Sequence, residues 1–127
     1  MATQAIRHGV KRVDTPREIH YSIGGLITEE DLRALQADLY KAALPFIEAK
    51  QPFRVLGDMR EFLPQKQEIV ELLRDSQQQS AKLGMEKMAI LFEQTLTKVQ
   101  FRRISDMVEI EFFTDRGEAL DWLRKTS

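Results

Sequence analysis

The charged residues Asp58, Arg60 and Glu61 stand almost side by side near the middle of the sequence. Two carboxylates and a guanidinium at this spacing can anchor the polar head of a ligand or a charged side chain of a partner. In the alternative interpretation, the Asp58 carboxylate only accepts hydrogen bonds from N–H groups of its own loop. The sequence leaves both interpretations open.

A second polar group, formed by Glu93, Thr95 and Thr97, lies at the start of a predicted helix. Hydroxyl groups near a helix N-terminus can bind an anion. Capping of the helix accounts for the same hydroxyls, since Thr97 and Gln100 have the spacing of a capping box. Acid–base catalysis by Asp58 and Glu93 would need a nucleophile or a metal beside them, and the sequence shows neither arrangement. We therefore predict a protein without catalytic residues.

Three apolar residues, Met59, Phe62 and Leu63, share the first segment with the charges. Apolar side chains in a loop need cover, which can come from the chain's own core, a ligand or a partner. Methionine adapts to irregular apolar surfaces of the kind that binding sites present. Burial in the chain's own core and exposure on a binding surface are both left open.

Metal and nucleic-acid sites find little support in the sequence. The two histidines, His8 and His20, have no carboxylates at metal-ligand spacing, and the chain has no cysteine. Lys98, Arg102 and Arg103 are typical of a solvated helix face, and 19 basic against 20 acidic residues give a net charge of -1. No P-loop, dinucleotide fingerprint, nucleophile elbow or HExxH motif occurs. We predict no metal, no cofactor and no nucleic-acid partner.

The length of 127 residues and the composition, 43% hydrophobic and 31% charged, are those of a single globular domain spanning residues 1–127. The longest apolar runs, such as 88–92, are about five residues, whereas a membrane helix needs about 18 or more. The N-terminus is charged where a signal peptide would be apolar. We therefore expect a cytoplasmic protein without stable membrane insertion.

Hydrophobic periodicity predicts the elements that must position these residues. Ile19, Tyr21 and Ile23 alternate with polar residues, as in a strand with one buried face, and segment 5–13 would pair with them as a hairpin. The run at 88–92 is apolar at every position, which is typical of a strand covered on both faces. Further strands are predicted at 53–58 and 108–113, and helices are predicted to begin at Thr28, Pro64, Thr95 or Thr97, and Asp115.

The order β-β-α-β-α-β-α-β-α predicts an α/β fold with one mixed, mostly parallel sheet of about five strands and about four helices. The first strand should be antiparallel to its neighbour. Ligands bind outside the carboxyl ends of parallel strands, which points to the loops at 58–63, 93–97 and 114–115. In the last of these loops, Thr114 and Asp115 are expected to act as helix caps.

Helix ends and helix faces give further expectations. Pro45 should kink or end the first helix, because it removes a backbone donor and clashes with the previous turn. Pro64 suits the first turn of the second helix, and Gly84 its C-terminal stop. In the third helix, Leu96 and Val99 should face inward, while the neighbouring basic residues should not.

Four short segments in a fixed order carry a resemblance to a known family. They are IGGLITEEDL at 23–32, VLGDMREF at 55–62, FFTD at 112–115 and EALDWL at 118–123. With these segments the chain resembles the STAS domain (sulfate transporter and anti-sigma-factor antagonist), and its SpoIIAA-like branch in particular. The resemblance covers nearly the whole chain and implies the STAS/SpoIIAA-like fold. The branch is also similar in architecture to CRAL-TRIO lipid carriers.

One departure separates this chain from anti-sigma-factor antagonists, which carry a phosphorylatable serine after an Asp in the loop behind the central strand. The corresponding segment 58–64 keeps Asp58 and has neither serine nor threonine. The next hydroxyl, Ser76, should lie on the inward face of the second helix, with 77–79 on its polar side. A phosphate there would bury a charge of about -2. We predict no phosphorylation between 58 and 76.

Two functions follow from the resemblance and from the absence of a catalytic arrangement. The leading hypothesis is a non-enzymatic STAS-like binding or regulatory module with an unknown protein partner. The alternative is a small carrier or sensor of an apolar or amphipathic ligand, similar to CRAL-TRIO proteins. The candidate binding residues are Asp58, Met59, Arg60, Glu61, Phe62, Leu63, Glu93 and Thr95.

The chain length limits how either function could work. A ligand pocket on the order of several hundred Å³ would need displacement of a helix or a subunit interface, because one sheet and its helices enclose little volume. We expect any homodimer to form through helix or loop faces. We do not expect the strand at 108–113 to pair with the same strand of another copy, because the charges of Glu109 and Glu111 disfavour extension of the sheet at this edge.

Overall fold

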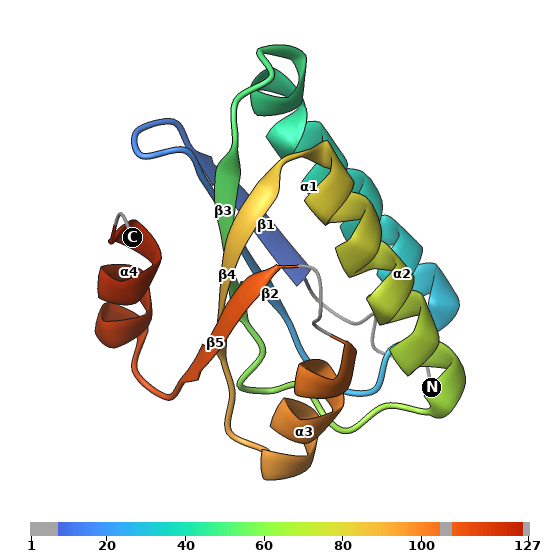
Figure 1. The fold of residues 1–127 in the computed structure, drawn as a ribbon. Helices are drawn as coiled ribbons and strands as arrows, with labels where there is room; N and C mark the ends of the chain where they lie inside the picture. The colour runs from blue at the N-terminus through green and yellow to red at the C-terminus, as the bar shows by residue number, and fades with distance from the viewer. Residues whose placement is uncertain (1–7, 105–107, 126–127) are drawn as a thin grey trace.

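A computed structural model of the protein describes residues 8–104 and 108–125, and of residues 103 and 104 it describes the backbone alone. The elements follow the predicted order and form an α/β fold (Figure 1). They are β1 (His8–Val13), β2 (Glu18–Ile23), α1 (Glu29–Glu48), β3 (Phe53–Asp58), α2 (Gln67–Leu83), β4 (Met85–Leu91), α3 (Thr95–Ile104), β5 (Glu109–Phe113) and α4 (Arg116–Arg124).

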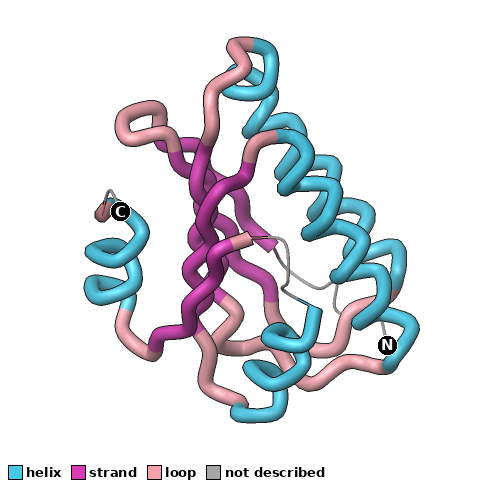
Figure 2. The backbone as a smooth tube through the Cα atoms, viewed as in Figure 1, coloured by secondary structure: helices cyan, strands magenta, loops and turns pink. Residues whose placement is uncertain are grey.

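The sheet has five strands in the order β1-β2-β3-β4-β5. β1 pairs antiparallel with β2, and the three remaining pairs are parallel, which confirms the mixed, mostly parallel sheet. Figure 2 shows the sheet between two unequal layers, with α1, α2 and α3 on one side and the short α4 on the other. Among residues 8–104 and 108–125, no helix combines the length and apolarity that crossing a membrane requires.

Each face of the sheet carries its own apolar cluster. The larger cluster joins the sheet to α1, α2 and α3, and it includes Ile19, Val55 and Ile90. The smaller one joins the sheet to α4 and consists of Leu56, Ala89, Leu91, Ala119 and Leu123, all fully buried. β4 therefore contributes to both clusters, as its continuous apolar run predicted.

The expectation that Pro45 would end the first helix is wrong, because α1 continues to Glu48, while a kink at this proline stays a prediction. A backbone hydrogen bond and a ring contact stabilise the final turn. Ala49 N donates a hydrogen bond to Pro45 O at 3.1 Å, and the Phe46 ring stacks on Phe53 of β3 with 6.0 Å between ring centroids. Packing of this turn on the sheet thus offsets the backbone donor that proline removes.

The expectation that Pro64 would lie in the first turn of the second helix is also wrong, since α2 begins at Gln67. The reason is the buried side chain of Gln65. Its Nε2 donates to Gly25 O at 3.0 Å, and its Oε1 accepts from Ile27 N at 3.1 Å. These bonds tie the chain before α2 to the segment after β2 and keep it non-helical. At the other end, Gly84 caps α2 with a positive φ of 120°, as predicted.

The predicted inner face of the third helix is wrong. Leu96 and Val99 are 57% and 42% exposed, whereas Thr97 and Phe101 are buried. Thr97 Oγ1 donates to Phe62 O at 3.2 Å, so this threonine turns toward the loop after β3 instead of capping its own helix.

Two more side chains of α3 differ from the expected arrangement. Gln100 exchanges two 2.9 Å hydrogen bonds with the Gln65 backbone, so Thr97 and Gln100 form no capping box. Lys98 is half-buried, with its Nζ 5.1 Å from the centroid of the Phe92 ring. α3 is therefore oriented by hydrogen bonds and ring contacts to other segments rather than by its exposed leucine and valine.

Candidate functional site

The loops that follow β3, β4 and β5 lie beside one another at the carboxyl ends of the strands. Met59 N donates to Leu91 O at 2.9 Å, and Phe92 N donates to Phe113 O at 3.1 Å. These bonds extend the parallel ladders by one step beyond the strands. The predicted loops at 58–63, 93–97 and 114–115 thus begin close to one another, as the topology rule predicted.

Asp58 and Arg60 form an ion pair within the first of these loops. Arg60 Nε donates to Asp58 Oδ1 at 2.9 Å, and Arg60 Nη2 donates to Asp58 Oδ2 at 2.7 Å. The hydrogen bonds from Arg60 hold the pKa of the Asp58 carboxyl below its ordinary value despite its partial burial. Glu61 and Glu93 are exposed and interact electrostatically with Arg60, and Thr95 is exposed at the start of α3. The Asp58 carboxylate is therefore engaged with its own loop.

Met59 and Phe62 are each only 1% exposed and belong to the larger apolar cluster. Of the two interpretations, the structure supports burial of these residues in the chain's own core. The alternative, in which the side chains of Met59 and Phe62 form a surface for a partner, is wrong. Leu63 is 40% exposed, and it shares this end of the molecule with exposed Leu26 and Leu96. Leu63 N donates to Gly25 O at 3.3 Å, which keeps Leu63 close to Leu26.

The two histidines each contact a different carboxylate. His8 Nε2 is 2.6 Å from Asp38 Oδ2 of α1, and His20 Nε2 is 2.9 Å from Glu18 Oε1 on the same strand. His20 Nδ1 also lies 3.3 Å from Arg116 Nη2. In the described part of the chain, no group of three His, Cys, Asp or Glu residues could hold a metal ion.

Glu18 is a buried carboxylate whose partners the sequence did not reveal. Its side chain is 1% exposed, and Arg124 of α4 donates two hydrogen bonds to it at 2.9 and 3.1 Å. Burial raises the pKa of Glu18, but the hydrogen bonds and charges of Arg124 and His20 outweigh it, so the pKa lies below its ordinary value. This pairing joins residues far apart in sequence, and no local pattern marks it.

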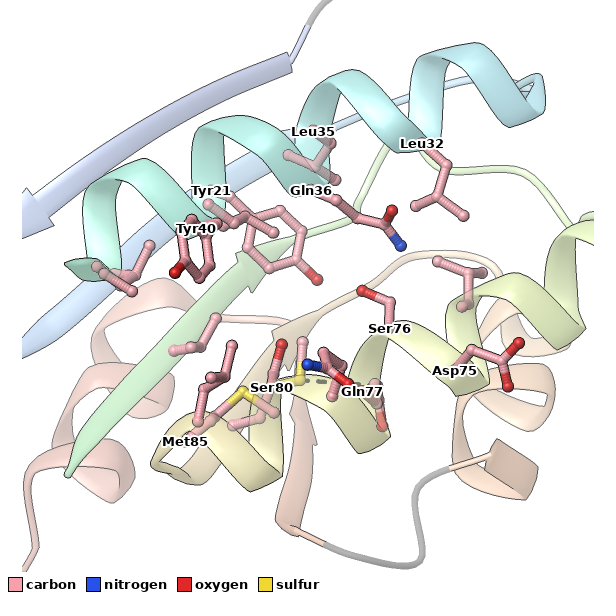
Figure 3. A pocket seen from close by; sticks show the side chains of 18 of the residues that line it. Tyr21, Leu32, Leu35, Gln36, Tyr40, Asp75, Ser76, Gln77, Ser80 and Met85 are labelled. Atoms are coloured by element: carbon pink, nitrogen blue, oxygen red, sulfur yellow. Dashed lines mark hydrogen bonds between the residues drawn. The ribbon is translucent and has the colours of Figure 1, made fainter. Parts of the chain in front are cut away.

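A cavity of about 470 Å³ lies between α1 and α2, above the middle of the sheet (Figure 3). The sheet supplies its floor, the two long helices supply its walls, and Phe101 of α3 contributes at one side. The lining side chains are mainly apolar and include Ile19, Leu32, Leu35, Leu39, Ala43, Phe53, Val55, Leu72, Leu73, Met85 and Met88.

The expectation that a pocket of this size would need helix displacement or a second subunit is wrong. Short side chains keep the space open, since Ala43 of α1 and Ser76 and Ser80 of α2 line it. Ser76 was predicted to face inward, and it is half-buried at the cavity. Gln77 was predicted on the polar side but is buried, with its Nε2 3.7 Å from Met88 Sδ. The serine at position 76 was the one local signal for this site.

Tyr21 forms part of the cavity floor and depends on a glycine in the neighbouring strand. A Cβ added at Gly57 would come within 2.6 Å of Tyr21 Cζ, so the absence of a side chain at Gly57 lets the tyrosine ring lie across β3. The hydroxyl of Tyr21 donates to Met59 Sδ at 3.5 Å. Burial raises the pKa of Tyr21 far above its ordinary value, so the hydroxyl keeps its proton throughout the neutral range.

Comparison with solved structures supports the fold. The chain is similar to an uncharacterized protein of the DUF3478 family from Shewanella loihica PV-4, whose 2.25 Å crystal structure has a SpoIIAA-like fold. The TM-score is 0.72 at 23% sequence identity, over 97% of this chain and 98% of that one. A search of curated proteins gives no match.

The family comparison covers most of the chain. The model of the SpoIIAA-like family matches residues 19–124, a range that runs from β2 through α4 and includes the cavity and the three loops. The match confirms the resemblance inferred from the four short sequence segments, while the architectural similarity to CRAL-TRIO carriers stays a prediction. The chain belongs to the SpoIIAA-like family.

Proposed function

We propose that the protein is a non-enzymatic binding module that holds a small apolar or amphipathic molecule between α1 and α2. The observation that carries this proposal is the cavity of about 470 Å³ with largely apolar walls. Small-molecule sites in proteins are commonly clefts of roughly 300–1,000 Å³ lined by apolar side chains with a few polar groups. The cavity agrees with this description in both size and lining.

The energetics of the cavity support a ligand. Side chains that face unfilled space lack the dispersion contacts of a close-packed core. A ligand that fills the space restores these contacts and removes apolar surface from water, at roughly 25 cal/mol for each Å². Because such a ligand binds the folded state alone, it also raises the free energy of unfolding.

Occupancy of the cavity offers a form of regulation that needs no phosphate. The loop after β3 has no hydroxyl to modify, and Ser76, the first hydroxyl after it, lines the cavity instead of standing at a helix start. In this proposal the chain responds to the presence of its ligand. Phosphopeptide mapping that located a phosphate between residues 58 and 76 would contradict this part of the proposal.

A cavity-filling variant tests the proposal. Native mass spectrometry of freshly purified protein should show a co-purifying mass in the lipid range. The Ser76→Phe variant should lose that mass, because the ring would occupy the space between the helices. The matched control is Gln78→Phe, on the same helix but outside the cavity lining.

The outcomes separate the cavity from the rest of the surface. Loss of the mass in Ser76→Phe with retention in Gln78→Phe supports the cavity as the site. Protein that carries no added mass, and whose melting temperature does not rise with any apolar or amphipathic additive, contradicts the proposal. Equal retention in both variants would place the ligand elsewhere on the chain.

A protein partner at the carboxyl ends of the strands is a second candidate function. Exposed Leu26, Leu63 and Leu96 favour it, since they stand on segments that hydrogen bonds hold together. The exposed charge of Glu61 and the half-buried Arg60 would lie beside such a contact. Leu63→Asp should then abolish recovery of a defined partner in a pull-down, while Ser76→Phe should leave it unchanged. Recovery that survives Leu63→Asp would contradict this candidate.

A further inference from the structure

Among the described residues that line the cavity, the polar side chains that are buried or half-buried are all uncharged, whereas Glu29, Arg33 and Asp75 are exposed. This difference bears on the chemical class of the ligand. Gln36 of α1, Ser76 and Gln77 of α2, and Tyr21 of the floor line the cavity. We infer that the ligand joins an apolar body to an uncharged hydrogen-bonding group, such as a hydroxyl, and not to a carboxylate or phosphate. This inference rests on the proposed binding function.

Tyr21 is the group that would recognise the ligand's polar end. It is 7% exposed, and the partner of its hydroxyl is the thioether of Met59 at 3.5 Å, a weak acceptor. Buried hydroxyls in proteins are usually paired with stronger partners. A ligand hydroxyl can donate a hydrogen bond to the Tyr21 oxygen or accept one from the Tyr21 O–H group, and in either case it is a stronger partner than the thioether.

Polar groups of two neighbouring side chains lie in the same part of the cavity as the Tyr21 hydroxyl. Figure 3 shows Tyr21, Gln36 and Ser76, which come from β2, α1 and α2, turning their polar ends toward the space between the helices. Both the amide and the hydroxyl can donate and accept hydrogen bonds. A neutral ligand group that both donates and accepts hydrogen bonds can therefore find partners there and needs no opposite charge.

An anionic group would find little compensation among the residues that line the cavity. Arg33 is the one cation among the described lining residues, and it is exposed. Its guanidinium is already paired with Glu29, with Nε 2.9 Å from Oε2. Asp75, also exposed, adds a negative charge at the rim. A buried carboxylate would lose its hydration without gaining a partner of opposite charge.

The tyrosines of the cavity supply a matched pair of variants. Tyr21→Phe keeps the ring across Gly57 and removes only the buried hydroxyl. Tyr40→Phe removes a hydroxyl from a residue that lines the same cavity but is 50% exposed. Circular dichroism and the melting temperature should confirm that both variants are folded before affinities are compared.

The experiment compares 1-octanol with octanoate by isothermal titration calorimetry at about pH 8, where a carboxylic acid is ionised. We expect 1-octanol to bind about tenfold more tightly than octanoate. Tyr21→Phe should lower the affinity for 1-octanol about fivefold to tenfold, which corresponds to one lost hydrogen bond. Tyr40→Phe should change this affinity less than about twofold.

The possible results distinguish this inference from the proposed function. Octanoate binding as tightly as 1-octanol, or Tyr21→Phe and Tyr40→Phe having equal effects, would overturn the neutral head group and leave the cavity as a binding site. Binding of neither compound, together with an unchanged melting temperature in both, would overturn the binding function itself and this inference with it.

Discussion

The two faces of the sheet are built in different ways. On the α4 face, five fully buried residues from β3, β4 and α4 form a small cluster. Charged side chains beside this cluster form hydrogen bonds between α4 and the sheet. Arg124 binds buried Glu18, and Lys87 Nζ donates to Trp122 O at 2.9 Å. On the opposite face, two helices of 20 and 17 residues cover a larger cluster but leave about 470 Å³ between them.

The difference indicates how structure and binding are divided in the molecule. A short helix of 9 residues contributes few apolar side chains, so hydrogen bonds to its C-terminal end make up part of its attachment. The long helices contribute many more apolar side chains to the cluster that they share with the sheet, and the space between them stays unfilled. We infer that the α4 face maintains the fold, whereas the α1–α2 face is free to bind a ligand.

The largest expected effect comes from truncating a leucine on the closed face. Leu123→Ala removes a side chain with 0% exposure and should lower the free energy of unfolding by about 3 kcal/mol. Leu72→Ala, at a half-buried residue of α2 that lines the cavity, should lower it by only about 1 kcal/mol, since that side chain already borders unfilled space. Urea unfolding of both variants measures the difference. Equal losses would contradict the distinction between a filled and an unfilled face.

Gly57→Ala tests the contact between β3 and the cavity floor. The new Cβ would come within 2.6 Å of Tyr21, so the ring must move toward the cavity, with an expected destabilisation of about 2 kcal/mol. The same change should weaken ligand binding, because the ring would take part of the free volume.

The matched control for Gly57→Ala is Gly9→Ala in β1. There the nearest atom to a new Cβ would be Ser22 Oγ at 3.4 Å, which is an ordinary contact. We expect unfolding curves and ligand-induced shifts of the melting temperature close to those of the wild type. A Gly57→Ala variant as stable as Gly9→Ala would show that the tyrosine ring has room to move without loss.

The sequence was sufficient to predict the order of the helices and strands and those of their features that depend on neighbouring residues. The two-residue period of β2, the Thr28 cap, the Gly84 stop and the Asp115 cap all depend on neighbouring residues. The structure confirms each of them. Where the relevant contacts are local, the pattern of residue types determines the local structure.

The errors come from contacts between residues distant in sequence. Gln65 delays the start of α2, and its bonds to Gln100 help to orient α3 so that Leu96 faces solvent. Polar side chains of this kind are expected on the surface, and nothing local marks the two that are used internally. The cavity escaped prediction for the same reason, since its volume depends on the spacing of α1 and α2, which only tertiary packing determines.

The smallest of these effects concerns the polar attachment of α4 and depends on pH. Glu18→Gln keeps the size of the side chain but removes its charge, which weakens the hydrogen bonds from Arg124 and His20. Because Arg124 is 45% exposed and stays hydrated without its partner, we expect a loss of only about 1 kcal/mol near pH 7.

The pH dependence of this loss gives a sharper measurement than its size. The folded pKa of Glu18 lies below its ordinary value of 4.5, so the carboxylate stabilises the fold fully above about pH 4.5. As the pH falls further, the unfolded chain binds the proton first and this stabilisation is lost through the folded pKa. The Glu18→Gln variant has no such group, whereas the lowered pKa of Asp58 is common to both proteins and cancels. Urea unfolding between about pH 7 and pH 3 should therefore show the gap between wild type and variant closing with acid. A gap that stays constant, or widens, would mean that the charge of Glu18 does not hold α4 on the sheet.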